Sequence, residues 1–412
     1  MVAPTESPAE KGSKRVTTAA PKSATDLRGR RRPAGNATKT RALVSRGGNF
    51  WLLITLVGVL CMIGVVMVFS ASSITSLKLF GSPWHYLVRE WIWLALGWAG
   101  LLLASKVHHS VWRRVTPLFM WGSVALLFAV LVPGIGVSAG GATRWIGTST
   151  VQIQPSELAK LALVFFAADV LDRRAGRGPW LYQASPVLAV LVIVAGLVMV
   201  QPDMGTTMVV AVVAASMLFA AGIPGRWMAG MGASAVVGAF GLAKVSPYRW
   251  RRITAFLHPF AHAYNSGYQS VEGLVALSNG HLVGDGIGTS LASYGYLPNA
   301  QTDFIFAVIG EETGLIGGLF VSGLFATLVL VGVRIAAKAP TRYAYLLATG
   351  ITAWIASQAV INIGAVVGIF PVTGVPLPFV SFGGSSLVIS LFGVGVLANI
   401  AKSSQAQRIA QP

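Results

Sequence analysis

An isolated carboxylate stands where a polar turn of the chain runs into an apolar stretch. In "YLPNAQTDFIFAVIGEETG", residues 296–314, Asp303 directly precedes the apolar "FIFAV". A carboxylate at the edge of a low-dielectric wall has a raised pKa and is a stronger base than an exposed one. The local alternative is that Thr302 and Asp303 only cap the following helix, and on these residues alone capping is the better interpretation. Glu311 lies about 12 Å further along such a helix, so we expect Glu311 and Glu312 to be structural.

Charged side chains in three other segments could bind a charged substrate. "YRWRR", residues 248–252, interleaves arginines with aromatic residues. Because arginine matches phosphate with paired hydrogen bonds, this segment fits either a lipid-headgroup belt or a site for a lipid diphosphate. In "IQPSELAKL", Glu157 falls three residues before Lys160, which fits a structural ion pair and a ligand contact equally well. Asp203, in "QPDMGTT", is expected to cap a helix through backbone amides in its first turn.

Patterns for metal or nucleotide binding are weak. His258, His262 and His281 have no metal-ligand spacing with a cysteine or a second motif, so we interpret them as loop histidines. "SNGHLVGDGIG" is rich in glycine but lacks the strand before it and the helix after it that a nucleotide-binding loop needs. Cys61 is the only cysteine, so no intrachain disulfide can form.

The composition identifies the solvent in which these side chains work. Hydrophobic residues make up 54% of the 412 residues, charged residues make up 11%, and the mean hydropathy is +0.68. With several apolar runs near the ~20 residues that cross a bilayer, this is an integral membrane protein. The net charge of +18 does not indicate nucleic-acid binding, because residues 1–48 hold eleven of the 31 Lys and Arg and flank the first span. We expect residues 1–48 to be a disordered cytoplasmic tail that binds anionic lipid.

An all-α membrane domain is predicted over residues 49–401, followed by a short cytoplasmic tail, residues 402–412. Its ten expected spans are 49–73, 85–105, 115–132, 155–171, 184–201, 204–222, 225–245, 303–333, 342–369 and 377–401. With the N-terminal tail inside, every even-numbered connection is basic, as the positive-inside rule requires. Both termini are therefore expected in the cytoplasm, and the long connections 133–154 and 246–302 are expected outside.

The polar residues of this domain gather at the outer ends of the expected spans. An ionisable side chain left in lipid costs a few kcal/mol or more, so such groups face the bundle interior or a wet cavity. The sequence therefore predicts a polar cavity that opens outward. The residues that map there are Glu90, Arg144, Gln154, Glu157, Lys160, Asp203, Arg249, Arg251, Arg252, Glu272, Asp285 and Asp303.

Five separate blocks of the chain carry a resemblance to a known family. They are "GGATRWIGTSTVQIQPSELAKLALV", "QPDMGTTMV", "RITAFLHPF" with "GYQSVEGLVAL", "YLPNAQTDFIFAVIGEETGLIGG" and "PVTGVPLPFVSFGGSSLV". In order and spacing they resemble the SEDS family (shape, elongation, division and sporulation), and its division branch most closely. The resemblance implies ten transmembrane helices and peptidoglycan glycosyltransferase activity on lipid II at the outer face of the plasma membrane, at the division septum. It also implies a class B penicillin-binding protein and other division proteins as partners.

The resemblance also implies a mechanism. The donor sugar is α-linked to a polyprenyl diphosphate and the polymer is β-linked, so a single inverting displacement fits. Because the leaving group is already a stabilised anion, only a base is required, and Asp303 is the candidate catalytic residue. Arg144, Lys160, Arg251 and Arg252 are candidates to hold the departing diphosphate. The full set of candidate substrate-binding residues is Arg144, Glu157, Lys160, Asp203, Arg251, Arg252 and Gln269.

Near Asp303 the sequence departs from the family's pattern at two positions. Family members commonly have "LPEAHTDF" where this chain has "LPNAQTDF", so Asn299 and Gln301 replace a Glu and a His. These changes put in doubt any role for the missing acid and imidazole, whereas Asp303 is retained. No dedicated metal cage is apparent in the sequence, and a divalent cation such as Mg²⁺ or Mn²⁺ is expected only to assist.

Three alternatives stay open at this point. The chain could be the elongation-type member of the same family. A lipid II flippase would need charged groups along a path through the bundle, whereas the inner half offers mainly Asp169 and Asp172. A pure scaffold for division proteins would leave the polar outer cluster unexplained.

Overall fold

The computed structural model describes residues 48–139, 142–148, 151–245 and 247–410, so the predicted tail lies outside the described residues apart from Gly48. In these residues, ten helices are 17 or more residues long, and each corresponds to one expected span. They are α2 (Gly48–Phe80), α3 (His85–Lys106), α4 (His109–Ala129), α5 (Pro155–Arg173), α6 (Trp180–Val200), α7 (Met204–Ala220), α8 (Gly225–Val245), α11 (Ile305–Ala337), α12 (Arg342–Val366) and α13 (Ser385–Ala410).

Six of these helices are long and apolar enough, by length and composition, to cross a membrane: α2, α3, α6, α11, α12 and α13. The other four are shorter or more polar. Helix α13 runs to Ala410, whereas the expected span ended at residue 401, so the predicted C-terminal tail is largely a helical extension. Lys402, Gln405 and Gln407 there are good helix formers, and their polarity hides the helix from a search for apolar spans.

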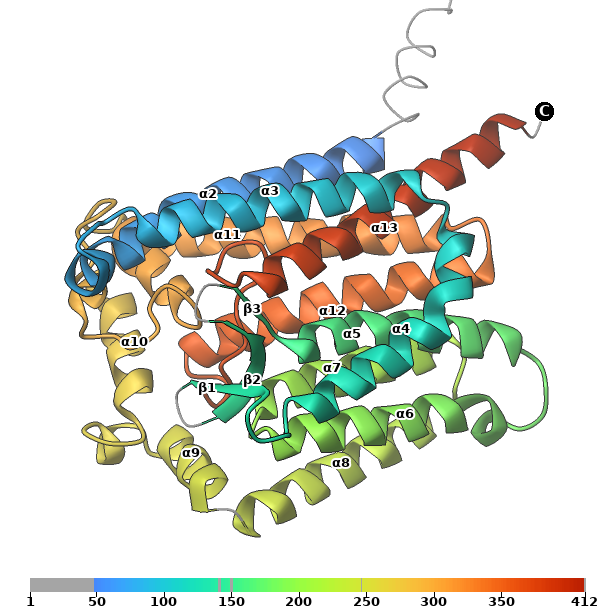
Figure 1. Ribbon diagram of the computed structural model, residues 1–412, viewed down its shortest axis with the longest axis horizontal. Helices are drawn as coiled ribbons and strands as arrows, with labels where there is room; N and C mark the ends of the chain where they lie inside the picture. The colour runs from blue at the N-terminus through green and yellow to red at the C-terminus, as the bar shows by residue number, and fades with distance from the viewer. Residues whose placement is uncertain (1–47, 140–141, 149–150, 246, 411–412) are drawn as a thin grey trace, which may run out of the picture. The chain divides into compact units, whose positions relative to one another are not determined.

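The connections separate to the two ends of the bundle as the charge pattern predicts. In Figure 1 the strands and helices α9 and α10 lie at one end, and the α5–α6 and α11–α12 turns and the C-terminus lie at the other. The end that holds the strands is the one predicted to face outward. Polar residues that are distant in the sequence can therefore meet at this end.

A small antiparallel sheet forms within the long connection that was expected outside over residues 133–154. Its order is β1 (Gly136–Ala139), β2 (Ala142–Gly147) and β3 (Gln152–Ile153). Val137 is paired with Trp145, and Ile146 with Ile153. The sheet fixes the direction of β2, and β2 carries Arg144.

The long connection 246–302, which was predicted to lie outside, contains four short helices in its described part, residues 247–302. They are α9 (Pro247–Leu257), η1 (Phe260–His262), α10 (Tyr268–Asn279) and η2 (Leu291–Tyr294). Between α10 and η2, the segment 281–286 runs beside a kink in α11 at Gly314, where φ is 69° and ψ is −170°. The kinked helix and this segment exchange four backbone hydrogen bonds of 3.0–3.2 Å. The glycine-rich "SNGHLVGDGIG" thus packs against a membrane helix.

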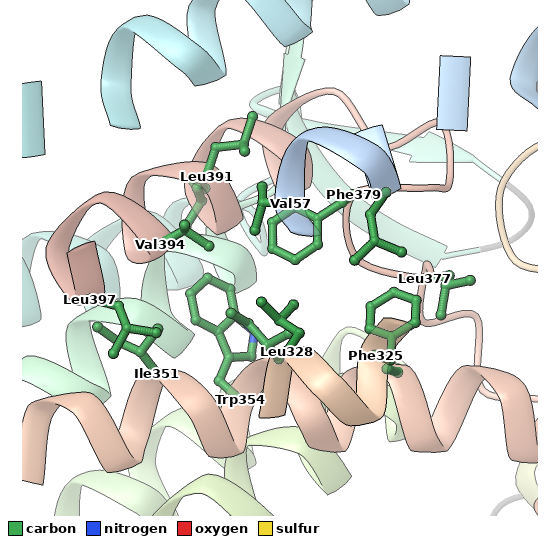
Figure 2. Packing of buried hydrophobic residues seen from close by; sticks show 14 of the residues in the cluster. Val57, Phe325, Leu328, Ile351, Trp354, Leu377, Phe379, Leu391, Val394 and Leu397 are labelled. Atoms are coloured by element: carbon green, nitrogen blue, oxygen red, sulfur yellow. The ribbon is translucent and has the colours of Figure 1, made fainter. Parts of the chain in front are cut away.

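The bundle core forms where α2, α11, α12 and α13 meet (Figure 2). Trp354 of α12 is fully buried and points toward Leu328 of α11 and toward α13. Val57 of α2 and Phe379, in the connection before α13, close the other side of this cluster. The packing holds α11 and α12 together, and the outer ends of these two helices carry the site.

Candidate active site

Asp303 lies in a tight turn just before α11. The turn is formed at Asn299, whose φ of 57° is left-handed, a conformation that asparagine tolerates better than most residues. The carbonyl of Asn299 accepts hydrogen bonds from the amides of Thr302 and Asp303 at 3.0 and 3.2 Å. Helix α11 begins after Phe304 and has no side-chain cap, so the Asp303 carboxylate does not serve as the cap that the local alternative proposed.

The carboxylate of Asp303 is half-buried among charged groups. Burial raises its pKa to about 6, and the negative charge of Asp203 acts in the same direction. Arg144, Arg252 and the hydroxyl of Thr302 oppose this shift because they favour the ionised form. The group therefore loses its proton near neutral pH and is a stronger base than an exposed aspartate.

Arg144 reaches the site from β2. Its Nε donates to the carbonyl of Gln201 at 3.2 Å, and its Nη2 donates to the carbonyl of Pro202. Nε also lies 4.0 Å from Oδ2 of Asp203. These contacts hold the guanidinium at the junction of α6 and α7 and leave Nη1 on the side of Asp303, where both groups border Gly374.

Asp203 caps helix α7, as its sequence context predicted. Its Oδ1 accepts from the amide of Thr206 at 3.0 Å, and its Oδ2 accepts from the Thr206 hydroxyl at 2.9 Å. Oδ2 also accepts from Nε2 of Gln154 at 3.5 Å. Asp203 thus fixes the start of α7 and, at the same time, contributes negative charge beside Asp303.

The second arginine of the site comes from α9. Arg252 donates from Nη1 to the carbonyl of Val372 at 3.2 Å and acts on the Asp303 carboxylate. Arg251 is exposed on the same helix and is not among the described groups that shift the pKa of Asp303. Gln269 donates to the carbonyl of Pro298 at 3.2 Å and so braces the turn before Asp303. Of Arg251, Arg252 and Gln269, only Arg252 is among the groups that shift the pKa of Asp303.

Glu157 and Lys160 form a buried ion pair on α5. Nζ of Lys160 lies 2.8 Å from the carboxylate of Glu157, and each side chain is 1% exposed. The same ammonium donates to Oε1 of Gln358 at 3.0 Å and lies 5.6 Å from the centre of the Trp354 ring. This arrangement favours the structural interpretation of the pair over direct substrate contact.

Glu311 and Glu312 are held by the protein, as expected for structural residues. Glu311 accepts hydrogen bonds from the hydroxyl of Ser290 and from the amides of Leu291 and Ala292, which begin η2. Glu312 accepts from the hydroxyl of Ser70 on α2. Both side chains are buried and belong to the attachment of the outer loop to α11.

Two neighbours of Asp303 were absent from the sequence-based candidates. Asn362 of α12 donates from Nδ2 to the carbonyl of Asp303 at 2.8 Å and to that of Val375 at 2.7 Å. Gly374 lies against both Asp303 and Arg144. A polar side chain inside an apolar helix is a functional signal, and that signal could have identified Asn362.

The described residues contain no group of three His, Cys, Asp or Glu side chains that could hold a metal ion. Asp203 and Asp303 are the carboxylates at the site, and Asp203 is already engaged by Thr206, Gln154 and Arg144.

Comparison with known sequences gives consistent matches. Residues 50–406 match the family of cell cycle proteins that comprises FtsW, RodA and SpoVE. A probable peptidoglycan glycosyltransferase FtsW from Geobacter metallireducens is 39% identical over 350 residues, which cover 85% of this chain and 93% of the relative. The stage V sporulation protein E of Bacillus subtilis is 38% identical over 355 residues, which cover 86% and 97%.

Solved structures share the arrangement of the helices. A chain from a peptidoglycan synthase complex, described as coordinating polymerization and crosslinking, matches with a TM-score of 0.72 at 28% identity, covering 86% of this chain and 98% of that one. The rod shape determining protein RodA of Thermus thermophilus matches with a TM-score of 0.63 at 28% identity, covering 86% and 96%.

Proposed function

The chain belongs to the FtsW/RodA/SpoVE family of cell cycle proteins and is a peptidoglycan glycosyltransferase, and we propose that Asp303 is its catalytic base. The observation that carries this assignment is one half-buried carboxylate with two arginines, Arg144 and Arg252, acting on it at the outer end of a membrane bundle. A base and a cationic clamp are the two parts that displacement of a lipid diphosphate by a sugar hydroxyl requires.

In the proposed reaction, Asp303 accepts the proton of the acceptor sugar hydroxyl while the oxygen attacks the anomeric carbon of the donor. The bond between that carbon and the diphosphate oxygen breaks, and the diphosphate leaves with the electron pair. Arg144 and Arg252 stabilise its charge in a site that excludes much of the water. The pKa of Asp303, about 6, keeps it largely ionised at neutral pH and still basic enough to assist.

A lipid-linked substrate also requires an apolar surface for its polyprenyl chain. A groove of about 480 Å³ lies between α4, α5 and α13, and it is lined by Trp112, Phe119, Leu126, Leu158, Phe165 and Phe392. From Leu126 to Trp112 the helix spans about 20 Å, at 1.5 Å per residue. An apolar groove whose lining residues extend this far along α4 supports binding of an isoprenoid tail along the bundle.

We also propose a cell location and partners for this protein. This multi-pass membrane protein is proposed to act at the division septum, with both termini in the cytoplasm and Asp303 outside. A class B penicillin-binding protein is the proposed partner that cross-links the new strands, and the match to a peptidoglycan synthase complex supports it. A divalent cation is proposed to assist only through the diphosphate itself, since Asp203 is committed to the α7 cap.

The flippase alternative gains no support from the inner half of the bundle. Arg113 lies 2.5 Å from Asp169 and 2.9 Å from Asp172, and Arg173 lies 2.8 Å from Asp169. These carboxylates are therefore neutralised near one end of the bundle and do not line a path across it.

Polymerisation of labelled lipid II by the purified protein with its transpeptidase partner tests the proposal. Asp303→Asn should lower the rate by ~10²-fold or more, in the range that loss of a general base produces. Asp285→Asn is the matched control, because Asp285 is an exposed aspartate of the same connection and is not among the groups that shift the pKa of Asp303. Polymer formation by Asp303→Asn at the Asp285→Asn rate would remove Asp303 as the base.

A further inference from the structure

We propose that the backbone segment 372–376 sets the spacing between base and diphosphate clamp, and that Gly374 leaves open the space that the reacting sugar occupies. This inference rests on the proposed function and assigns a role to a segment that carries no charge. Its sequence, "VTGVP", offers only main-chain groups and small or apolar side chains for contact with the site.

Three carbonyls of the segment are bound by side chains from the helices around it. Arg252 donates to Val372 at 3.2 Å, Asn362 donates to Val375 at 2.7 Å, and Gln358 donates to Pro376 at 3.2 Å. Through Gln358, the segment is also joined to the ammonium of Lys160. The segment thus connects one member of the clamp, the buried ion pair and helix α12.

Gly374 occupies the point where the two reacting functions meet. A Cβ added there would lie 3.5 Å from Oδ2 of Asp303 and 3.7 Å from Nη1 of Arg144. The acceptor hydroxyl must contact Asp303 and the leaving diphosphate must contact Arg144, so the anomeric carbon passes between these two atoms. A methyl group at residue 374 would project into that space.

Tight packing keeps the backbone segment 372–376 from moving. Thr373 and Val375 are 3% and 2% exposed. A Cβ on Gly205 of α7 would lie 2.4 Å from Val375 Cγ2 and 2.7 Å from the carbonyl of Thr373, so the segment rests directly on the helix backbone. Pro371 and Pro376 restrict the backbone on either side. An intruding side chain at Gly374 would therefore displace the substrate before it displaced the segment.

Asn362 is the positioning residue that joins this segment to the base. Both hydrogen bonds of its Nδ2 go to carbonyls, one of Asp303 and one of Val375, which fixes its amide orientation. The side chain is 2% exposed, so these bonds meet little competition from solvent. Asn362 thus sets where Asp303 stands relative to Gly374 without contacting the reacting atoms itself.

Gly368 provides a matched control for Gly374. The φ angles are 78° and 72°, so alanine is strained similarly at both positions. A Cβ at either glycine would make contacts of ordinary length, but the nearest group at Gly368 is the apolar Leu274, at 3.7 Å, and Gly368 lies outside the site. Any difference in kcat/KM between Gly374→Ala and Gly368→Ala is therefore due to the groups that surround Gly374.

Polymerisation of lipid II and thermal unfolding are measured for both variants with the transpeptidase partner present. Gly374→Ala and Gly368→Ala should lower the melting temperature by similar amounts. Gly374→Ala should lower kcat/KM at least tenfold, whereas Gly368→Ala should stay within about twofold of the wild type. Equal kcat/KM values for the two variants would overturn the role of Gly374.

Asn362→Leu tests the positioning role. Loss of both hydrogen bonds lets Asp303 move relative to Arg144 and Arg252, so the acidic limb of the pH–rate profile should shift away from pH 6 while kcat falls. A fall in kcat with an unshifted limb would overturn positioning by Asn362. If Asp303→Asn remained active, the proposed function would be refuted. If Asp303→Asn were inactive but Gly374→Ala and Gly368→Ala had equal kcat/KM values, only the present inference would be refuted.

Discussion

Asp303 combines burial, which makes its carboxylate a stronger base, with two arginines that keep the ionised form accessible. Without Arg144 and Arg252, burial and the nearby charge of Asp203 would raise the pKa of Asp303 further and disfavour the ionised form. Without burial, the carboxylate would be ionised but too weak a base to assist a sugar hydroxyl. Removal of one arginine should therefore affect both the proposed base and the proposed diphosphate clamp, and we expect the two effects in different kinetic parameters.

The pH dependence of polymerisation follows from the same balance. Because the base must be ionised, the rate should rise with pH through about 6 and then level off. Arg144→Gln removes a positive charge that favours ionisation, so the midpoint should move to higher pH as the maximal rate falls. A pH–rate profile of both proteins under single-turnover conditions measures the midpoint. A wild-type midpoint near the ordinary aspartate pKa of 3.8 would contradict this account.

Stability should respond to Asp303 in the opposite direction from activity. The folded carboxyl binds its proton more tightly than the unfolded one, so the stabilisation that it contributes is present at low pH and is lost as pH rises from about 4 to about 6. Asp303→Asn mimics the protonated form at every pH. At pH 7 it should unfold at a temperature equal to or above that of the wild type, although we expect it to be inactive. A clear loss of thermal stability would indicate that its inactivity comes from misfolding.

The buried pair of Glu157 and Lys160 should behave as a structural unit. Removing one partner leaves an uncompensated buried charge, so Glu157→Ala or Lys160→Ala should each destabilise the protein by ~3–5 kcal/mol. The double change Glu157→Leu/Lys160→Met removes both charges and should cost less than either single change. Thermal unfolding alongside the polymerisation assay separates stability from activity. If either single variant kept full stability but lost activity, substrate contact would be the better assignment.

The kink in α11 attaches the outer loop to the membrane bundle. A Cβ at Gly314 would lie 2.5 Å from the carbonyl of Leu282 and from the amide of Gly284, and its φ of 69° already disfavours other residues. Gly314→Ala should therefore destabilise the protein by ~2–4 kcal/mol. Gly323→Ala, on the same helix with open space around it, should be neutral or stabilising by up to ~1 kcal/mol. Thermal unfolding of the two variants measures the difference, and similar melting temperatures would contradict the tight packing at the kink.

The ten spans of the bundle were predictable because apolar runs and basic connections are properties of the sequence itself. The sheet that carries Arg144 was missed because its strands have two to six residues, too few for an alternating pattern. Asp303, Arg144 and Arg252, which the structure brings together, were among the sequence-based candidates because charge is rare in this chain and because of the family resemblance. Asn362 was missed because its partners are main-chain carbonyls of distant segments, and Gly374 was missed because it borders side chains of distant segments. Both sets of contacts form only once the helices have packed.

The orientation of the bundle can be tested with single cysteines. Cys61 is the only cysteine of the sequence, so Cys61→Ser provides a background without thiols. Tyr264 in the outer connection is 96% exposed, and Arg177 is exposed in the α5–α6 turn. Because basic turns stay in the cytoplasm, an impermeant maleimide should label Tyr264→Cys in intact spheroplasts and Arg177→Cys only after permeabilisation. Labelling in the reverse pattern would place Asp303 on the cytoplasmic side, where the base would face precursors that have not yet crossed the membrane.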